Sequence, residues 1–337
     1  MRRIPLSLLL LLAAIALPTG CRKKDGGTAT TQAARTATLQ LNWKPEAQFG
    51  GFYAAGLPGG AFAARGLDVT VTPGGVGTPT VQMVGAGRAD FAVVSADEVV
   101  VARSNGNDVV ALLAVYQDCP QGLMTRASRG FKGIGDVFKA NGTVAMQKGL
   151  PYAQLLERQY GFDKVKVVPS PGGDVSVFLK DETFAQQCFV TSEPLAAKRA
   201  GVEPKTFLVK EAGYNPYTTV LVTRGELLLK DPARVRDVTQ ACKAGWDAYL
   251  ADPAPANAAM RALNPGVDAA TLAESAEVQK PLILTDDAKA NGVGSMTLAR
   301  WEELVRQLAD LKVIDKAPAA GTCFVTPAAL DAAAAGR

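Results

Sequence analysis

The middle of the chain alternates short strand-like runs with stretches of helical spacing. The runs LDVTV at residues 67–71, DVVALLAVY at 108–116 and KVKVVP at 164–169 are rich in β-branched residues, and helical patterns separate them. Strands that alternate with helices are typical of βαβ units and parallel sheets. The sequence therefore predicts an α/β fold. At 337 residues, the chain is long enough for about two domains.

The last third of the chain has a different pattern, with long amphipathic helices. Residues 231–252 and 297–314 place apolar side chains at a spacing close to 3.6 residues. We expect these helices to pack against the outside of the sheets. The apolar face of the second helix is formed by Leu298, Trp301, Leu304, Val305, Leu308 and Leu311.

Several junctions between a strand-like run and a helix carry polar residues that start helices. Thr78-Pro79 offers an N-cap followed by proline, Ser95 follows FAVV, and Ser192-Glu193-Pro194 follows CFVT. In open α/β sheets, ligands bind beyond the carboxyl ends of the strands, where helix N-termini present free N–H groups. We therefore expect these junctions to face one ligand site.

Composition and charge narrow the class of protein. Hydrophobic residues make up 48% and charged residues 20% of the chain, which is typical of a folded protein and not of a disordered one. The formal net charge is +4, but the basic residues are scattered and form no stripe interleaved with aromatic residues. A nucleic-acid partner is therefore not expected.

The N-terminus reads as an export signal. Arg2 and Arg3 precede an apolar stretch from Leu6 to Leu17 that is too short to span a bilayer, and LPTGC follows. Gly20-Cys21 resembles the lipobox of bacterial lipoproteins, in which the cysteine is lipidated; ordinary cleavage nearby, giving a soluble secreted protein, is the alternative. We expect a signal with lipidated Cys21 over residues 1–21 and a flexible tether over 22–36. No later segment is long and apolar enough to cross a membrane.

Four cysteines remain if Cys21 is lipidated: Cys119, Cys188, Cys242 and Cys323. Export permits disulfides, and four thiols allow three pairings that the sequence does not separate. Cys242 falls in an apolar helical series, which is also typical of a buried free thiol.

The sequence contains no histidine. This excludes histidine general bases, Ser-His-Asp and Cys-His catalytic arrangements, and the commonest metal ligand. Neither CxxC nor HExxH occurs, and GGVGTPT at residues 74–80 lacks the third glycine of a dinucleotide fingerprint and the Gly-Lys-Ser/Thr of a P-loop. We expect no metal, no cofactor and no enzymatic activity. A secreted enzyme that uses only carboxylates remains an alternative.

Six segments in order resemble one known family. They are LNWKPEAQFGGFYAAG (41–56), ARGLDVTVTPGG (64–75), VQMVGAGRADFAV (81–93), VTSEPLAAKRAG (190–201), GYNPYTTVLVTR (213–224) and GSMTLARWEEL (294–304). Together they resemble the solute-binding proteins of ABC importers in the thiamine-pyrimidine-precursor group, whose relatives include alkanesulfonate, taurine and riboflavin receptors. The similarity runs from about Thr38 to Val325.

The resemblance implies a type II periplasmic-binding-protein fold, with two α/β lobes joined by two hinge strands. Hinge candidates lie at residues 112–117 and 218–223, so lobe I would comprise 37–117 plus 219–327, with lobe II, 118–218, inserted. It also implies a monomer on the periplasmic or extracellular face of the membrane, with an ABC permease as partner. One relative in this family is an enzyme that consumes its own histidine, an activity that this chain cannot have.

The loop after the first strand offers residues suited to a flat ligand. Trp43 and the Phe52-Tyr53 pair can stack on a ring, and Asn42 and Gln48 supply donors and acceptors together. Gly50-Gly51 would let the backbone come close to the ligand. Phe52 and Tyr53 are alternatively core residues of the first helix.

Glu193 is the strongest single candidate, because it resembles the acid of the family's Glu-Pro pair and could accept hydrogen bonds from an amine and a ring N–H. Its alternative role is a helix-start acid stabilised by the dipole. Ser95 and Asp97 either cap a helix or contact the ligand. Further candidates are Gln121, Tyr152, Tyr214, Asn215 and Tyr217.

The expected ligand is a thiamine-precursor pyrimidine or a similar planar nitrogen heterocycle. The first-strand loop carries no arginine for a sulfonate. Riboflavin is the alternative heterocycle and would need a larger cleft, whereas an alkanesulfonate or taurine would need an anion site.

Overall fold

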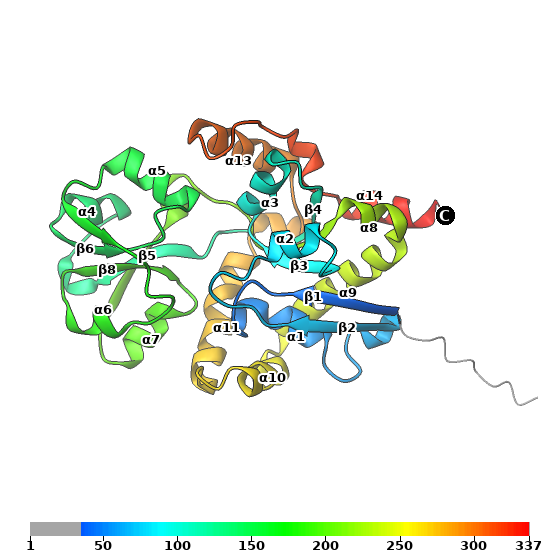
Figure 1. Cartoon of the computed structure of the whole chain (residues 1–337). Coiled ribbons are helices and arrows are strands. Elements are labelled where there is room, and N and C mark those ends of the chain that lie inside the picture. The colour runs from blue at the N-terminus through cyan, green and yellow to red at the C-terminus, as the bar shows by residue number, and fades with distance from the viewer. Residues whose placement is uncertain (1–34, 337) are drawn as a thin grey trace, which may run out of the picture. The chain divides into compact units, whose positions relative to one another are not determined.

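A computed structural model of the chain describes residues 35–336, and these residues contain two five-stranded sheets (Figure 1). The first sheet has the order β2-β1-β3-β10-β4 and the second the order β7-β6-β8-β5-β9. The strands of the first sheet are β1 (Arg35–Gln40), β2 (Leu67–Thr72), β3 (Phe91–Val94), β4 (Val109–Tyr116) and β10 (Thr218–Arg224). Those of the second are β5 (Gln121–Arg126), β6 (Gly142–Ala145), β7 (Val165–Val168), β8 (Phe184–Phe189) and β9 (Pro204–Leu208).

We call each sheet with its helices a lobe. Lobe I holds the first sheet with α1 (Gly50–Ala55), α2 (Thr80–Gly85), α3 (Ala96–Ser104), α8 (Gly225–Lys230), α9 (Pro232–Ala251), α10 (Ala254–Leu263), α11 (Ala269–Ile283), α12 (Asp286–Asn291), α13 (Leu298–Asp310) and α14 (Pro327–Ala335). Lobe II holds the second sheet with α4 (Ile134–Lys139), α5 (Pro151–Tyr160), α6 (Ser176–Lys180) and α7 (Glu193–Arg199). Short 3-10 turns complete them: η1 (Ala47–Phe49), η2 (Ala63–Arg65), η3 (Ala127–Arg129), η4 (Val209–Ala212) and η5 (Ala320–Thr322).

The sheets are mixed, whereas the sequence pattern predicted parallel sheets. β1 runs parallel to β2 and β3, but β10 is antiparallel to both β3 and β4. In the second sheet β6 is parallel to β7 and β8, while β5 is antiparallel to β8 and β9. The expectation failed for β10 because this strand arrives from the second sheet and not through a βαβ crossover.

Two chain segments, residues 117–120 and 209–217, link the sheets, and polar contacts tie them together. The Asp118 carboxylate accepts from Lys210 Nζ at 2.6 Å and from Asn215 Nδ2 at 3.0 Å, and Asn215 Oδ1 accepts from the Cys119 N–H at 2.8 Å. Arg300 of α13 donates to the carbonyls of Gln117 and Asn215. The predicted hinge positions at 112–117 and 218–223 fall within β4 and β10, except Gln117, which begins the first link. Hinge motion stays a prediction.

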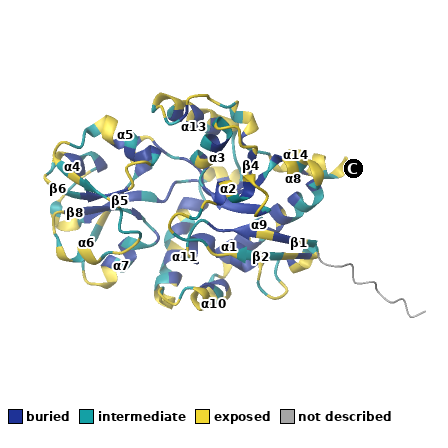
Figure 2. Ribbon diagram, in the orientation of Figure 1, coloured by how far each residue is buried: buried dark blue, intermediate teal, exposed yellow. Residues whose placement is uncertain are grey.

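The long C-terminal helices form as their apolar spacing predicts, but two residues of the predicted apolar face differ: Leu298 is exposed and Leu311 follows the end of α13. α9 begins where Asp231 accepts a hydrogen bond from the Arg234 N–H, and α13 buries Trp301, Leu304, Val305 and Leu308. Figure 2 shows buried residues along the central strands and exposed residues on outer helices such as α10 and α14. α2 differs from expectation, since it begins at Thr80 and the Thr78 hydroxyl instead accepts from the Gly75 N–H at 2.9 Å, which closes the loop before the helix.

Gly50 and Gly51 serve helix packing, and this corrects the expectation that they approach a ligand. A Cβ on Gly50 would lie 2.1 Å from the Tyr249 ring, and one on Gly51 would lie 2.2 Å from the Trp246 ring. Only glycine therefore lets α1 rest on these two α9 side chains. Phe52 packs edge-on against Trp246 with ring centroids 5.8 Å apart.

Cys119, Cys188, Cys242 and Cys323 are all buried free thiols, so the structure shows no disulfide within residues 35–336. Cys242 is buried in α9, as its apolar series suggested.

Within residues 35–336 no helix combines the length and hydropathy that a bilayer span requires. The export signal, Cys21 and most of the tether lie outside the described part, but Arg35 and Thr36 already belong to β1, where Arg35 pairs with Asp237 at 2.6 Å.

Candidate ligand-binding site

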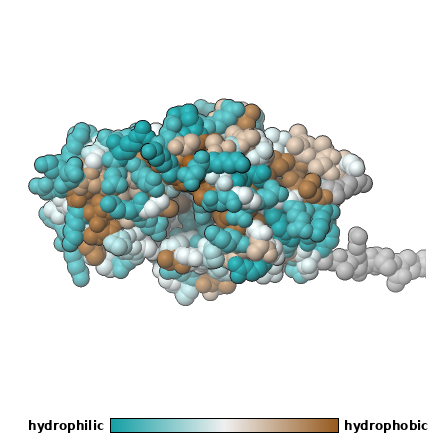
Figure 3. Space-filling view, turned by 45° about the horizontal axis from the view of Figure 1, so that its top comes forward, coloured by the Kyte–Doolittle hydropathy of each residue, from teal (hydrophilic) through white to brown (hydrophobic). Residues whose placement is uncertain are grey.

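A cavity of about 670 Å³ is lined by residues of both lobes. Lobe I contributes the segments that follow β1, β2 and β3, and lobe II contributes those that follow β6, β7 and β8. These are the carboxyl ends of strands, where open α/β sheets bind ligands. We call this cavity the cleft. A recess is visible in the face drawn in Figure 3, between largely hydrophilic surfaces.

The structure brings nine of the candidate residues to the cleft. They are Asn42, Trp43, Gln48, Ser95, Asp97, Gln121, Tyr152, Glu193 and Tyr214. They come from separate parts of the chain, so the cleft gathers residues that only the fold makes neighbours. Their contact with a ligand stays a prediction.

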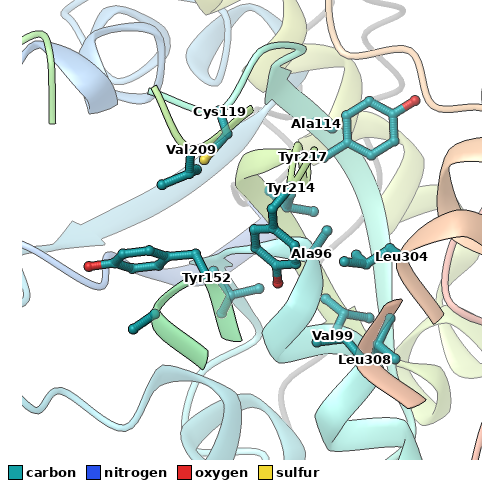
Figure 4. Close-up of a cluster of buried hydrophobic side chains, with 14 of the residues drawn as sticks. Ala96, Val99, Ala114, Cys119, Tyr152, Val209, Tyr214, Tyr217, Leu304 and Leu308 are labelled. Atoms are coloured by element: carbon teal, nitrogen blue, oxygen red, sulfur yellow. The ribbon is translucent and has the colours of Figure 1, made fainter. Parts of the chain in front are cut away.

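The other four candidates do not line the cleft. Phe52 and Tyr53 are buried in the core of lobe I, and burial raises the pKa of the Tyr53 phenol to about 12. Asn215 is used by the link between the sheets. Tyr217 is buried, stacks under the Arg300 guanidinium at 3.8 Å, and lies on the far side of Tyr214 from Tyr152 (Figure 4). For Phe52 and Tyr53 the alternative role in the core therefore replaces the predicted ligand role, and Asn215 and Tyr217 are corrected to structural contacts of the linking segment and α13.

The loop after β1 is held in place by a second loop. The Gly74 N–H donates to the Trp43 carbonyl at 2.9 Å. A Cβ on Gly74 would lie 2.2 Å from the Leu41 carbonyl oxygen, so the close approach of the two loops requires glycine there. This contact positions the partly buried Trp43 ring on the cleft wall.

Glu193 is the first residue of α7, and one of its carboxylate oxygens has a structural partner. Oε2 accepts from the Phe189 N–H at 2.8 Å, which closes the turn between β8 and α7. Burial raises the pKa of this carboxyl to about 7, against the opposing effect of backbone N–H groups, and the negative charge of Glu46 raises it further. Glu193 therefore combines the predicted helix-start role with a place in the cleft.

Glu46 lines the cleft and was missed by the sequence analysis. It precedes η1 in the first-strand loop, between two residues, Trp43 and Gln48, that were singled out. Burial raises its pKa, while hydrogen bonds from the Trp43 and Ser192 side chains and the charge of Lys44 act in the opposite direction. An acidic residue in a loop that was already predicted to bind the ligand is the signal that could have identified Glu46.

The start of α3 presents a hydrogen-bonded group of side chains. Glu98 accepts from the Ser95 N–H at 2.8 Å, which is the helix-capping role considered for this junction. The hydroxyl of Tyr214, which belongs to the second link between the sheets, donates to Asp97 Oδ2 at 2.9 Å. In Figure 4 the Tyr214 ring lies between Tyr152 and the residues of α3.

Amide side chains are the main polar groups on the lobe II wall. Gln187 Oε1 accepts from the Tyr152 hydroxyl at 2.8 Å and from the Gln147 N–H at 2.7 Å. The Gln121 amide donates to the Cys188 carbonyl at 3.1 Å. Gln187 and Gln147 both line the cleft and were not among the predicted residues, because isolated glutamines carry no recognisable spacing.

The charged side chains that line the cleft are all acidic among residues 35–336. Its lining includes the carboxylates of Glu46, Asp97, Glu98 and Glu193, and no lysine or arginine among residues 35–336 contributes to it. No group of three or more potential metal ligands occurs in that part of the chain. A ligand in this cavity therefore meets carboxylates, amides and aromatic rings, and it finds no cationic side chain to neutralise an anion.

Two thiols, Cys119 and Cys188, also line the cleft. Burial raises the pKa of Cys119 to about 11 and that of Cys188 well above its usual value. Because the thiolate is the nucleophile of cysteine chemistry, these groups are unreactive thiols at neutral pH.

Comparisons with known proteins place this geometry in context. A riboflavin-binding protein, RibY, of Chloroflexus aurantiacus is 23% identical over 263 residues, which cover 73% of each chain. The aliphatic sulphonate binding protein SsuA of Escherichia coli superimposes with a TM-score of 0.67 at 13% identity, covering 86% of this chain and 92% of that one. The desulfurization enzyme DSZB superimposes with a TM-score of 0.58 at 16% identity, over 88% and 98%.

These structural similarities confirm the predicted periplasmic-binding-protein fold, and the DSZB match shows that this fold also carries enzymes. The family model described as NMT1/THI5 like matches residues 46–256, which is more than half of the chain. The match includes Glu46, Gln48 and Glu193 and begins just after Asn42 and Trp43. The chain therefore belongs to the NMT1/THI5-like family.

Proposed function

We propose that this protein is the solute-binding component of an ABC importer and that it captures a thiamine-precursor pyrimidine or a similar planar nitrogen heterocycle. In this proposal the protein is exported, is anchored through lipidated Cys21, and delivers its ligand to a membrane permease. The family membership, the fold and a cleft between two lobes support a receptor.

The charge of the cleft is the observation that carries the choice of ligand. Four carboxylates and several amides line it without a lysine or arginine among the described residues. Carboxylates accept hydrogen bonds from exocyclic amines and ring N–H groups, and each such bond is worth about 1.5–3 kcal/mol because one partner is charged. A sulfonate would meet like charge in the same place. The proposal therefore differs from the ligand in the name of the SsuA structure.

Trp43 and Glu193 have the principal roles in this proposal. The Trp43 ring stacks on the heterocycle, and Glu193 accepts hydrogen bonds from its amine edge. Asn42, Gln48 and Gln121 satisfy the remaining donors and acceptors of the ring.

Riboflavin is the second candidate, and two observations favour it. The cavity of about 670 Å³ is larger than a single pyrimidine ring requires, and the curated relative named above is a riboflavin-binding protein. Riboflavin is also a planar nitrogen heterocycle, so the same wall of amides and aromatic rings would serve it.

An enzymatic role has less support. The two cleft thiols are protonated at neutral pH, and the sequence has no histidine to activate them. Turnover of any bound heterocycle by the purified protein would overturn the receptor proposal.

Calorimetric titration with formylaminopyrimidine, thiamine, riboflavin and taurine tests the function directly. We expect binding of at least one heterocycle and none of taurine. Protein purified from its native host would be yellow and fluorescent if riboflavin is the ligand. Tight binding of taurine alone would refute the proposal. Replacement of Cys21 by alanine, followed by mass measurement of the exported protein, tests the lipid anchor separately.

A further inference from the structure

The four carboxylates that line the cleft fall into two pairs, and no lysine or arginine among residues 35–336 lines the cleft beside either pair. Asp97 accepts from the Tyr214 hydroxyl, and Glu98 accepts from the Ser95 N–H at the start of α3. Glu46 and Glu193, by contrast, belong to different lobes and face the same cavity.

The geometry places Glu46 and Glu193 close together. Ser192, the residue immediately before Glu193, lines the cleft with Glu46 and is near enough to lower its pKa, and the charge of Glu46 in turn raises the pKa of Glu193. Glu193 Oε2 is held by the Phe189 N–H, whereas a Cβ added at Gly173, whose φ is +98°, would lie 3.8 Å from Oε1. Gly173 therefore lies beside Oε1, the oxygen that faces away from the Phe189 N–H.

The lysines and arginines near this pair lie outside the cleft, although the charge of Lys44 lowers the pKa of Glu46. Lys44 is exposed and lies 6.0 Å from the centre of the Trp43 ring. On α11 and α7, which pack against each other, Arg199 pairs with Glu274 at 2.7 Å and Lys280 pairs with Glu277 at 2.7 Å. None of these lysines and arginines lines the cleft.

The remaining titratable groups around Glu193 do not supply a positive charge either. On β9, Lys205 lies over the Phe207 ring at 5.8 Å. Asp174, in the loop beside Gly173, accepts from the Ser176 N–H at 2.7 Å. Cys188 and Tyr152 are buried and protonated at neutral pH.

A buried amide beside the pair also lacks a partner. Gln48 is only 8% exposed and lines the cleft, yet its side chain takes part in none of the hydrogen bonds of residues 35–336. The Gln48 amide therefore faces the cleft with its donors and its acceptor free for a ligand.

We propose that Glu46 and Glu193 form a cross-lobe acid pair that selects a positively charged nitrogen heterocycle, which makes Glu46 a specificity-determining residue. This inference rests on the proposed function and narrows its ligand class from planar heterocycles to cationic ones. A ligand cation between the two carboxylates replaces their mutual repulsion with two attractive contacts. Without it, the charge of each carboxylate disfavours ionisation of the other.

The pair has a defined effect on stability. The pKa values of both carboxyls are raised by burial, that of Glu193 to about 7. A carboxyl whose pKa is higher in the folded than in the unfolded state stabilises the fold while it is protonated, and this stabilisation is lost as the pH rises toward the folded-state pKa. The unliganded protein should therefore be less stable at pH 8 than the Glu46→Gln variant, and the two should converge near pH 5.

Thermal unfolding of the unliganded protein tests the pair without any ligand. We expect Glu46→Gln to raise the melting temperature by about 2 °C at pH 8 and to leave it unchanged at pH 5. Glu277→Gln, which changes an acid outside the cleft, should show no such pH-dependent difference. A change in melting temperature of equal size at both pH values would refute the proposal that Glu46 and Glu193 form an acid pair.

Titration with thiamine and riboflavin tests the preference for charge. Thiamine carries a permanent positive charge and riboflavin is neutral between pH 6 and 8. We expect the affinity for thiamine to rise about tenfold from pH 6 to pH 8, and Glu46→Gln to make this rise smaller, while the affinity for riboflavin stays constant.

The outcomes separate this inference from the proposed function. Thiamine affinity that does not change with pH, or binding of riboflavin alone, would refute the acid pair and leave the heterocycle receptor intact. If neither heterocycle binds, the proposed function fails, and the unfolding experiment alone decides whether the pair exists.

Discussion

Two adjacent stretches that follow β1, residues 42–48 and 50–53, have different structural roles. Residues 42–48 contribute Trp43 and Glu46 to the cleft, whereas Gly50, Gly51 and Phe52 lie in the core against α9. Both stretches contain aromatic residues, so aromatic content does not distinguish them. The difference lies in what surrounds the rings, because the first stretch carries an acid and amides and the second carries glycines that admit a neighbouring helix.

Gly51→Ala should have the largest effect, a loss of stability, and it tests whether residues 50–53 form a packing surface. A Cβ there would lie 2.2 Å from the Trp246 ring, so α1 must move off α9. We expect the free energy of unfolding to fall by about 3 kcal/mol, as measured by urea denaturation. Gly75→Ala is the matched control, because no atom lies within 4 Å of the added Cβ. Equal stability of the two variants would show that this stretch is not a packing surface.

Glu193→Gln should have the largest effect on binding. The amide oxygen can still accept from the Phe189 N–H, so the turn before α7 is kept while the charge is lost. We expect heterocycle affinity to fall at least tenfold, or about 1.4 kcal/mol, in calorimetry. Glu182→Gln, at an exposed carboxylate of the same lobe, should bind as the unmodified protein does. Unchanged affinity of Glu193→Gln would remove this residue from the site.

Trp43→Ala should weaken binding less. Loss of one stacked ring removes about 1 kcal/mol, so we expect an affinity about five times lower and little change in unfolding. Trp43→Phe keeps a ring and should recover most of the affinity. If Trp43→Ala instead unfolds the protein and leaves affinity unchanged, residues 42–48 are part of the core and the comparison with residues 50–53 fails.

The smallest effect concerns backbone strain where the chain re-enters the first sheet. Thr219 is a buried β-branched residue with a φ of +54°, on the lining of the cleft. Thr219→Gly should raise the free energy of unfolding by about 0.5 kcal/mol, because relief of strain slightly exceeds the entropy cost of glycine. Its neighbour Thr218 has no positive φ, so Thr218→Gly should lower the same quantity by about 1 kcal/mol. Destabilisation by both variants would show that Thr219 is not strained.

Much of the fold could be predicted from the sequence because the periodicity of α9 and α13 and the short runs of β3 and β6 are local signals. The mixed order of the sheets could not, since β10 pairs with β3 and β4, which lie about a hundred residues earlier. Polar residues at strand ends, such as Asn42, Ser95 and Glu193, reached the cleft because the carboxyl ends of strands converge there.

The errors at the site have a physical reason as well. Asn215 and Tyr217 follow Tyr214, which does line the cleft, but alternate residues of an extended segment face opposite sides. The Tyr217 ring stacks on the Arg300 guanidinium, and the Asn215 amide donates to Asp118. The role of Gly50-Gly51 depended on the side chains of Trp246 and Tyr249, nearly two hundred residues later. Such long-range packing leaves no mark on the local pattern.

The central claim is that residues 42–48 of one lobe and residues 189–193 of the other enclose one heterocycle. Hydrogen–deuterium exchange, measured with and without whichever of thiamine, formylaminopyrimidine and riboflavin binds in calorimetry, tests it most directly. We predict that the ligand slows exchange in both segments together and leaves α1 unchanged. Slower exchange in only one of the two segments, or only on surfaces outside the cleft, would contradict the account.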